Sequence, residues 1–527
     1  MNYIELFAGC GGLSLGLESE RFKLLFANEI SPMAAETFAF NHLKENLEEC
    51  VKLATPPKKT FWLNSKFPKH LLEKRLRENP FDAPKFGHGF NDLTTDPFLF
   101  HRGLITGSII DLNQYLESNK KLLKIVTTGF GDGGVDLVSG GPPCQGFSMA
   151  GLRDHSNKRN RLPWEFARFV KLVQPKVALL ENVTGILRAF NVEGKKIYPW
   201  FEIAKVFSSI GYVPICLHIN AKYVGIAQNR PRFMMLAVRS DIYKKVISKI
   251  DKKNEKEIFE NSLGFFNKIQ NKGNVKYGIL KCWDVEKHKD AFVDTMFSPL
   301  FKYSKGEWRT IEDAIDDLRR NSKTKISSYV KELNTCFNQK CDEEAVVENI
   351  ELRRNSSIVR SRFHLYQLLS KVVPSVTKEV YSFLRNQEKP LTDFTATEML
   401  KYTYRDCQTL ESVSFDTKIQ LEEFLTKLKT KKITQKALVP HNPAPAALTI
   451  PDDTCHYHHN ELRTLTVREM ARIQSFPDRF VFKSKVTTGG HMRKFEVPQY
   501  TQVGNAVPPL LGKAIGKVLL KLINLSQ

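Results

Sequence analysis

The amino-acid sequence predicts an α/β protein with a largely parallel sheet and a separate, smaller domain. The first observation is that short apolar runs alternate with helix-like segments through the first half of the chain, as they do in a sheet covered by helices. The second is the length of 527 residues, which is more than one hydrophobic core usually organises. The third is a change of character after about residue 240, where Lys-rich runs replace the alternation. We therefore expect two or three domains, with the sheet in the first half of the chain.

Six runs in the first half are short and mostly apolar, and most are followed by Gly, Pro, Asn or Asp and then by a helix-like stretch. Ligands of such sheets bind beyond the carboxyl ends of the strands, so the residues directly after each run are the first candidates for a functional site. We expect strands at Tyr3–Phe7, Lys23–Asn28, Val135–Ser139, Val177–Leu180, Tyr212–Ile219 and Arg232–Val238.

Three helices are indicated by their ends. A helix over Leu13–Glu20 is expected directly behind the first strand and a glycine-rich turn. Thr466 and Glu469 are three residues apart, as in a capping box, and predict a helix within Leu465–Phe476. An amphipathic helix from Pro509 onward is expected to close the chain.

Two stretches interrupt the alternation and suggest the domain boundaries. Residues 41–103 are rich in Lys, Pro and aromatic residues, and we expect an insertion there within a cofactor-binding catalytic domain of residues 1–240. Residues 241–440 are expected to form the second domain, which ends at the stiff, Pro-rich linker Pro440–Pro445. Residues 441–527 are expected to return to the catalytic domain.

The charge balance is strongly basic: 79 Lys and Arg against 57 Asp and Glu give a net charge of +22. Such a surplus favours a polyanionic partner, because each neutralised phosphate releases counterions. The chain opens without the basic start and apolar run of a secretory signal, and no apolar run approaches bilayer length. Nine scattered cysteines do not have the spacing of a disulfide framework. We expect a reduced, soluble, cytoplasmic protein.

A glycine-rich turn follows the first predicted strand. Phe7-Ala8-Gly9-Cys10-Gly11-Gly12 allows backbone N–H groups to approach a ligand at a helix N-terminus. Glu29 ends the next strand, where a doubly wound fold places an acid that binds ribose hydroxyls. The two features point to a nucleotide-like cofactor, although a purely structural glycine turn has the same pattern.

Further polar groups lie at later strand ends. Cys144 stands in Gly140-Gly141-Pro142-Pro143-Cys144-Gln145-Gly146-Phe147-Ser148, after the strand Val135–Ser139. A single cysteine is usually a small buried apolar residue, but the flanking Pro-Pro and Gly favour a rigid, exposed turn that suits a nucleophile. Glu181 and Asn182 follow the next strand, where a carboxylate is costly unless it is exposed or used. Arg230 and Arg232 precede the last strand, and a solvated strand end explains these two equally well.

Together these residues resemble the cytosine-5 DNA methyltransferase family, of the bacterial restriction–modification type. The glycine turn, Pro-Cys-Gln, Glu-Asn-Val, Gln-x-Arg-x-Arg and the C-terminal run Gln502–Pro509 occur in the family's order. The likeness covers roughly residues 1–40, 104–240 and 440–525. It implies a Rossmann-like sheet that binds S-adenosyl-L-methionine. It also implies transfer of the methyl group to carbon 5 of a cytosine that is flipped out of duplex DNA.

The resemblance implies a role for each motif. Cys144 attacks carbon 6 of the cytosine, Glu181 engages ring N3 and the exocyclic amine, and Asn182 orients that carboxylate. Arg230 and Arg232 hold the O2 of the base and a nearby phosphate, and they favour the thiolate. The residues implied in cofactor binding are Phe7, Gly9, Gly11, Gly12, Glu29, Ile109, Asp111, Pro143, Asn505 and Val507; those implied in DNA binding are Gln145, Ser148, Arg153, Arg159 and Arg161.

Two positions depart from the family's pattern. The chain has Gly107-Ser108-Ile109 where the family usually has Gly-Asp-Ile, so the contact with the adenine amino group falls to Asp111 or to nothing. It has Ala227 where the family tends to have Pro. Neither departure touches Cys144 or Glu181.

The implied partner is double-stranded DNA, read by the second domain and enclosed by the loop Ser148–Leu162, with the protein a monomer. A restriction endonuclease is expected as a functional counterpart without a stable complex. A tRNA cytosine-5 methyltransferase of related fold and a DNA-binding regulator without catalysis stay open as alternatives. No metal is expected: Cys455, His456, His458 and His459 lack a second pair at ligand spacing.

Overall fold

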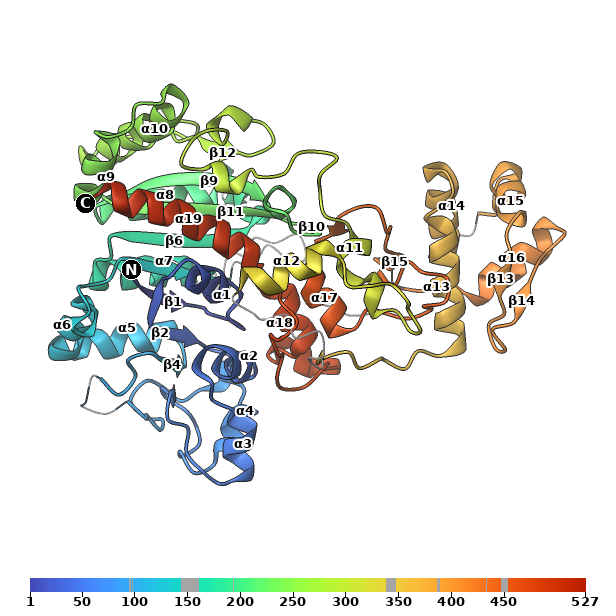
Figure 1. Ribbon diagram of the computed structural model, residues 1–527, viewed down its shortest axis with the longest axis horizontal. Helices are drawn as coiled ribbons and strands as arrows, with labels where there is room; N and C mark the ends of the chain where they lie inside the picture. Colours follow the sequence, from blue (N-terminus) through green and yellow to red (C-terminus); the bar gives the residue numbers. More distant parts are fainter. Residues whose placement is uncertain are drawn as a thin grey trace.

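The protein consists of a large α/β body and a small helical part that projects from it (Figure 1). The computed structural model describes residues 1–93, 96, 98–143, 161–192, 194–337, 347–385, 389–432, 434–446 and 454–527. Both ends of the chain lie on the large body (Figure 1).

A nine-stranded sheet forms the centre of the large body, in the order β12-β9-β11-β6-β5-β1-β2-β4-β3. Only β11 runs antiparallel to its neighbours among these strands. The α/β class and the largely parallel sheet are therefore confirmed. The strands are β1 (Asn2–Leu6), β2 (Lys23–Glu29), β3 (Thr60–Trp62), β4 (Gly103–Thr106), β5 (Leu137–Gly140), β6 (Val177–Val183), β9 (Tyr212–Asn220), β11 (Pro231–Arg239) and β12 (Cys282–Asp284).

All six predicted strands are present, within two residues at their start and within three at their end. They were predictable because successive side chains point to opposite faces and both faces are buried. Tyr3 belongs to one apolar cluster and Ile4 to the other, on opposite faces of the sheet. Three strands of this sheet were not predicted: β3, β4 and β12.

Helices cover both faces of this sheet. One apolar cluster joins the strands to α5 (Ile109–Ser118), α6 (Lys120–Thr127), α7 (Leu162–Val173) and α8 (Pro199–Ser209). The other joins them to α1 (Gly12–Ser19), α9 (Ser240–Ile247) and α19 (Pro509–Leu525), while α10 (Lys253–Gln270) contributes to both. The predicted first and last helices are thus confirmed.

The two ends of the chain meet where α1 packs on α19. A Cβ atom on Gly16 would lie only 2.4 Å from the carbonyl carbon of Gly512. The backbones of the two helices are therefore in direct contact at this point, where no side chain fits. The first and last motifs of the sequence are consequently brought to the same side of the sheet.

The stretch predicted to open a separate domain at residue 241 instead continues the large body. α9, α10 and β12 pack on the sheet because their apolar side chains, such as Tyr243 and Trp283, complete its core. α11 (Ile311–Ile315) and α12 (Ser328–Cys336) then share a core with α17 (Val467–Ile473). The Pro-rich linker is also held on the body, since β16 (Ala444–Pro445) pairs with β10 (Gln228–Asn229).

The small helical part has a core of its own, drawn from residues 363–437 and Cys455. It comprises the helices α13 (Ser357–Leu369), α14 (Pro374–Leu384), α15 (Asp393–Leu400) and α16 (Lys418–Lys427), with the short hairpin β13 (Tyr404–Arg405) and β14 (Ser412–Val413). It lies away from the sheet, on the right in Figure 1. The self-contained unit is thus shorter than the predicted 241–440.

The remaining elements are short. They are α2 (Pro32–Phe38), η1 (Ala39–Leu43), α3 (Leu47–Lys52), α4 (Leu72–Leu76), η2 (Pro80–Asp82), η3 (Gly129–Gly131), η6 (Thr184–Leu187), β7 (Phe190–Val192), β8 (Lys195–Ile197), η7 (Ala221–Val224), η8 (Lys289–Ala291), η9 (Ser298–Leu300), η10 (Asp316–Leu318), β15 (Lys436–Ala437), β17 (Thr454–Cys455), η12 (Gly490–Lys494) and α18 (Gln499–Asn505). Within the described ranges, no helix is both long and apolar enough to cross a membrane.

Candidate active site

The glycine turn between β1 and α1 has the backbone conformation that its sequence suggests. Gly9 (φ 57°) and Gly11 (φ 93°) lie in the left-handed region, and so does Phe7 (φ 55°). The space around a Cβ atom on Gly9 is open, whereas a Cβ on Gly11 would lie 2.2 Å from Nε2 of His42. Glycine is therefore required at position 11 for both conformation and space, and the backbone at position 9 stays accessible to a ligand.

Glu29 closes this turn from the end of β2. Its carboxylate accepts hydrogen bonds from the backbone N–H groups of Gly9, at 2.7 Å, and Ser31, at 2.8 Å. Burial raises the pKa of Glu29, and these two hydrogen bonds oppose the shift. The structure thus joins Gly9 and Glu29 by a hydrogen bond, and their roles in cofactor binding stay predictions.

The C-terminal motif lies directly behind the glycine turn. A Cβ atom on Gly12 would lie 2.2 Å from the carbonyl oxygen of Val507, so this glycine is needed for packing. Asn505 is exposed and Val507 is half-buried beside it. The segment of Asn505 and Val507 therefore lies next to the glycine turn, and the roles of these residues in cofactor binding stay predictions.

Arg230 joins this C-terminal motif to the sheet. Its side chain is buried, and Nη2 donates hydrogen bonds to the carbonyl oxygens of Gly504, at 2.8 Å, and Ala506, at 3.0 Å. Sequence reasoning assigned this guanidinium to the base and a phosphate and missed the two carbonyl contacts. Those contacts come from a segment about 270 residues later in the chain, which no local pattern reveals.

Glu181 and Arg232 form a buried ion pair on adjacent strands. Nε of Arg232 lies 2.8 Å from Oε1 of Glu181, and both side chains are about nine-tenths buried. Burial raises the pKa of the Glu181 carboxyl, while the guanidinium groups of Arg232 and Arg230 oppose the shift. The result is a carboxyl at the carboxyl end of β6 that can exchange a proton with a bound group.

Asn182 ties the end of β6 to the turn that leads to Cys144. Its side-chain amide donates a hydrogen bond to the carbonyl oxygen of Pro142 at 2.9 Å. A Cβ atom on Gly141 would lie 3.0 Å from Oε2 of Glu181, so this turn also passes close to the carboxylate. The predicted residue Pro143 follows and is exposed.

Several predicted residues lie outside the described part of the chain. They are Cys144, Gln145, Ser148, Arg153 and Arg159. Arg161 is described; it is exposed and precedes the first residue of α7. The turn that leads to the nucleophile is therefore placed, and the roles of these residues stay predictions.

The end of β4 holds the remaining predicted cofactor residues. Ile109 is buried, and the hydroxyl of Ser108 accepts a hydrogen bond from the N–H of Ile110 as the cap of α5. Asp111 is half-buried and accepts a hydrogen bond from the side chain of Asn64 at 3.0 Å. Sequence reasoning missed Asn64, because it belongs to the insertion and carries no motif.

These groups fit S-adenosyl-L-methionine. The accessible backbone at Gly9, the acid at the end of β2 and the polar residues at the next strand end are what a doubly wound sheet offers a nucleoside. Phe7, Gly9, Gly11, Glu29, Ile109 and Asp111 would hold it from the N-terminal half, and Asn505 and Val507 from the C-terminal motif.

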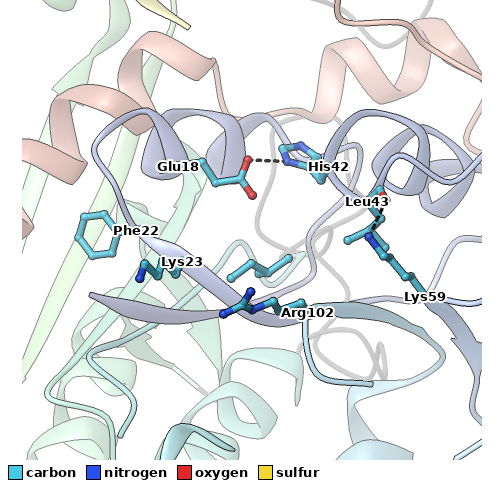
Figure 2. A pocket seen from close by; sticks show the side chains of 8 residues that line it. Glu18, Phe22, Lys23, His42, Leu43, Lys59 and Arg102 are labelled. Carbon is cyan, nitrogen blue, oxygen red and sulfur yellow. Dashed lines mark hydrogen bonds and ion pairs between the residues drawn. The ribbon is translucent and has the colours of Figure 1, made fainter. Parts of the chain in front are cut away.

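A separate pocket of about 460 Å³ lies away from this edge of the sheet (Figure 2). Lys23 and Arg102 line it and lie at or next to the amino-terminal ends of β2 and β4, whereas the candidate site lies at the carboxyl ends. The ion pair of Glu18 with His42 borders it (Figure 2). None of the predicted site residues lines this pocket.

Comparison with known proteins decides the family. The family model for C-5 cytosine-specific DNA methylases matches residues 1–65 and 113–521. The chain belongs to this family. The methylase is 25% identical over 525 residues to the type II methyltransferase M.DdeI of Desulfomicrobium norvegicum, covering 98% of this chain and 88% of that protein. It is 26% identical over 529 residues to the type II methyltransferase M1.HphI of Haemophilus parahaemolyticus, covering 99% and 87%.

The solved structure of the S. pombe Dnmt2 methyltransferase is also similar to the methylase. It is 13% identical, with a TM-score of 0.41 over 99% of this chain and 98% of that chain.

As a member of this family, the methylase is an S-adenosylmethionine-dependent DNA (cytosine-5-)-methyltransferase. The predictions of enzyme class, DNA substrate and methyl donor are confirmed. The family model leaves residues 66–112 unmatched, a gap that contains Asp111 and most of the insertion.

The side chains of His456 and Cys455, in the segment predicted to hold no metal, make local contacts. Nδ1 of His456 accepts a hydrogen bond from the N–H of His458 at 3.0 Å, and the Cys455 side chain is buried in the small helical part. In the part of the chain that the structure describes, no three His, Cys, Asp or Glu side chains are placed to hold a metal ion.

Proposed function

We propose that the methylase modifies cytosine through a covalent bond between Cys144 and carbon 6 of the base. The observation that supports this most directly is the hydrogen bond from Asn182 to the carbonyl oxygen of Pro142. It links the turn that carries the thiol, two residues further on, to the strand that carries Glu181. The described part of the turn before Cys144 is thereby held next to the strand that carries the proposed acid–base group.

Each proposed step balances protons and electron pairs. The thiolate of Cys144 forms a bond to carbon 6, and the ring electron pair moves towards N3, where Glu181 supplies a proton. Carbon 5, now an enamine carbon, forms a bond to the methyl group as the bond between that methyl and the sulfonium sulfur breaks. As the thiolate departs, water accepts the proton on carbon 5 and N3 returns its proton to Glu181, which regenerates the aromatic ring and the free nucleophile.

The environment of Glu181 suits this role. Burial raises the pKa of this carboxyl, and Arg232 lies beside it as its ion-pair partner. The cofactor supplies an electrophilic methyl group when it is bound. Glu29, Gly9 and Asn505 orient it, and Arg230, next to β11, holds the end of α18 that carries Asn505.

Access to the target requires that the cytosine leave the duplex, at a cost of a few kcal/mol. We propose that the loop Ser148–Leu162 closes on DNA, with Arg153, Arg159 and Arg161 against phosphates. Protease sensitivity of this loop should fall when cognate duplex and S-adenosylhomocysteine are added together. Unchanged cleavage at saturating duplex would contradict the closure.

Sequence recognition is assigned to residues 241–440, chiefly to the small helical part with its own core. We further propose that the methylase acts in the cytoplasm as a monomer. Its proposed biological role is to protect DNA from a restriction endonuclease that makes no stable complex with it. The named relatives are type II methyltransferases, which supports this role.

The deciding experiment is covalent trapping. The full-length protein is incubated with S-adenosylmethionine and duplexes that carry 5-fluorocytosine, because fluorine cannot leave carbon 5 and the adduct persists. A complex that survives denaturation in the wild type and is missing in Cys144→Ala supports the proposal. A trapped complex that persists in Cys144→Ala, or a full rate of methyl transfer in that variant, overturns it. Bisulfite sequencing of DNA from expressing cells gives the modified site.

A further inference from the structure

The pocket at the amino-terminal ends of β2 and β4 has no part in the proposed reaction. Its volume of about 460 Å³ lies within the range of cavities that hold small molecules. We call it the amino-end pocket. Phe22, Leu24 and Leu43 give it an apolar wall, of which Phe22 and Leu43 are buried. Its size and this wall suit an organic ligand with an apolar ring rather than a bare ion.

Three cationic side chains line the amino-end pocket because three neighbouring strands begin there. Lys23 is the first residue of β2, Arg102 directly precedes β4, and Lys59 directly precedes β3. β2, β4 and β3 are adjacent and parallel, so their starts lie at one edge of the sheet. The backbone N–H of Arg102 donates to the carbonyl oxygen of Leu25 at 2.6 Å, and the carbonyl oxygen of Lys59 accepts from the N–H of Leu104 at 2.8 Å. The fold itself therefore gathers positive charge at this pocket.

These cations keep hydrogen-bonding capacity for a ligand. Nζ of Lys59 donates to the carbonyl oxygen of Leu43 at 3.1 Å, and an ammonium group has three donors. Nη2 of Arg102 lies 3.7 Å from Oδ2 of Asp132, and the Arg102 side chain is 65% exposed. A long, exposed ion pair of this kind contributes little, so the guanidinium is available to an anion.

Glu18 forms the opposite side of the pocket and faces Lys23 and Arg102 (Figure 2). Its Oε2 lies 2.9 Å from Nδ1 of the buried His42 side chain, and its Oε1 accepts a hydrogen bond from the hydroxyl of Tyr3 at 3.3 Å. These contacts fix the carboxylate, which can still accept a hydrogen bond from a ligand. Among the described residues that line the pocket, Glu18 alone is acidic, so positive charge is in excess.

We propose that the amino-end pocket binds a nucleoside monophosphate. The phosphate lies between Lys23 and Arg102, because a guanidinium matches phosphate oxygens in a bidentate geometry and an ammonium group adds charge. The base packs on the apolar wall, and an amino or hydroxyl group of the nucleoside donates to Glu18. A phosphate of the DNA backbone would use the cations alone and leave the wall and Glu18 without a role, which favours the free nucleotide.

The test is calorimetric titration of the full-length protein with adenosine 5′-monophosphate after saturation with S-adenosylhomocysteine. Saturation keeps the nucleotide out of the cofactor site, wherever that site lies. The wild type should bind the nucleotide with a Kd below about 1 mM. Adenosine lacks the phosphate and inorganic phosphate lacks the nucleoside, so each should bind at least about tenfold more weakly, the worth of one charge-assisted hydrogen bond.

Arg102→Gly and Arg21→Gly form a matched pair of variants. Both arginines have a left-handed backbone, at φ 59° and φ 66°, which glycine adopts readily, and both variants lose one positive charge. Arg21 is exposed and does not line the pocket. Arg102→Gly should weaken nucleotide binding about tenfold, as should Lys23→Ala, whereas Arg21→Gly should change it by less than about twofold. All three variants should methylate duplex DNA at the wild-type rate.

Equal weakening in Arg102→Gly and Arg21→Gly would overturn the inference, because general charge and not the pocket would then attract the nucleotide. So would a Kd above about 1 mM, nucleotide binding no tighter than that of adenosine or inorganic phosphate, or binding that needs an empty cofactor site. A loss of duplex affinity in Lys23→Ala without a loss of nucleotide affinity would assign the cations to DNA and equally refute it. If Arg102→Gly melts early, Lys23→Ala takes its place, with the exposed Lys58→Ala as the control outside the pocket.

Discussion

Arg230, the residue directly before β11, donates a hydrogen bond to the carbonyl oxygen of Gly504 at 2.8 Å. It joins residues 274 positions apart and fixes the last turn of α18, which ends at Asn505, against the sheet. A hydrogen bond between a buried guanidinium and carbonyl groups is worth more than a surface contact, because its loss would leave buried polar atoms without a partner.

Replacing Arg230 by Lys should therefore destabilise the protein and loosen the cofactor loop. The lysine side chain is shorter than that of arginine, so its ammonium group falls short of the position of Nη2, and we expect a loss of about 2–3 kcal/mol. Thermal melting and binding of S-adenosylhomocysteine measure the two effects. Arg232→Lys is the control, expected to lower methyl transfer more than it lowers cofactor affinity. Equal cofactor affinity in Arg230→Lys and the wild type would contradict the assignment.

Gly11→Ala should weaken cofactor binding and stability together. The backbone at φ 93° costs roughly 1–2 kcal/mol for an L-residue, and the Cβ atom would also meet His42. Gly131, at φ 92° with open space around a Cβ, separates the two causes: Gly131→Ala should show the conformational cost alone. Adding His42→Ala to Gly11→Ala should recover the part that is due to the clash. If the two glycine variants melt alike, the contact with His42 is unimportant.

The free energy of unfolding should fall as the pH rises, because of the buried carboxyl of Glu5. Its carboxyl is buried in β1, where burial raises the pKa to about 8 although Ser14 donates a hydrogen bond to it. A folded-state pKa above the unfolded value means that the stabilisation is complete below about pH 4.5 and is lost as the pH rises through 8. A difference of one between the folded and unfolded pKa values corresponds to about 1.4 kcal/mol of unfolding free energy. Urea denaturation at pH 5 and pH 8 should show a smaller loss in Glu5→Gln than in the wild type.

Glu181→Gln should reduce methyl transfer by a factor of about 10² to 10⁴, the usual range for loss of a general acid–base group. The amide keeps the shape but cannot exchange the proton with N3. The single-turnover rate at saturating DNA and cofactor is the measurement, and the affinity for cognate duplex should change little. A rate within about threefold of the wild type would exclude the proposed proton transfer.

Asn182→Ala should slow catalysis without changing the affinity for S-adenosylhomocysteine. Loss of the bond to Pro142 frees the turn before Cys144, and displacement of a nucleophile by about 1 Å costs roughly 10²-fold in rate. Asn229→Ala, at an exposed asparagine on β10, is the control and should keep the wild-type rate.

Much of the central fold could be predicted because its signals are local. Apolar runs such as Val177–Leu180 are buried on both faces of a parallel sheet, and burial selects such residues directly. The capping box of Thr466 and Glu469 is present at the start of α17, as its spacing indicated. β12 escaped prediction because it has only three residues and pairs with β9 about 65 residues earlier in the chain.

The residues of the candidate site could be predicted only where, as in the strands, a local pattern marks them. Gly9 and Glu29 could be named from their places after strands, and the structure joins them by a hydrogen bond. Asn64 could not be found, since an asparagine among Lys and Pro residues has no pattern that separates a buried donor from a surface turn.

By itself the sequence determined which side chains lie at the ends of which strands, and with them the type of chemistry the edge of the sheet can support. That information is carried by neighbours in the chain, through periodicity and turn residues. Only the tertiary structure decided that Arg230 holds the C-terminal loop, that Asn64 faces Asp111, and that residues 241–300 complete the sheet. Those contacts join distant segments, and they depend on which buried polar and apolar groups find partners once the whole chain is packed.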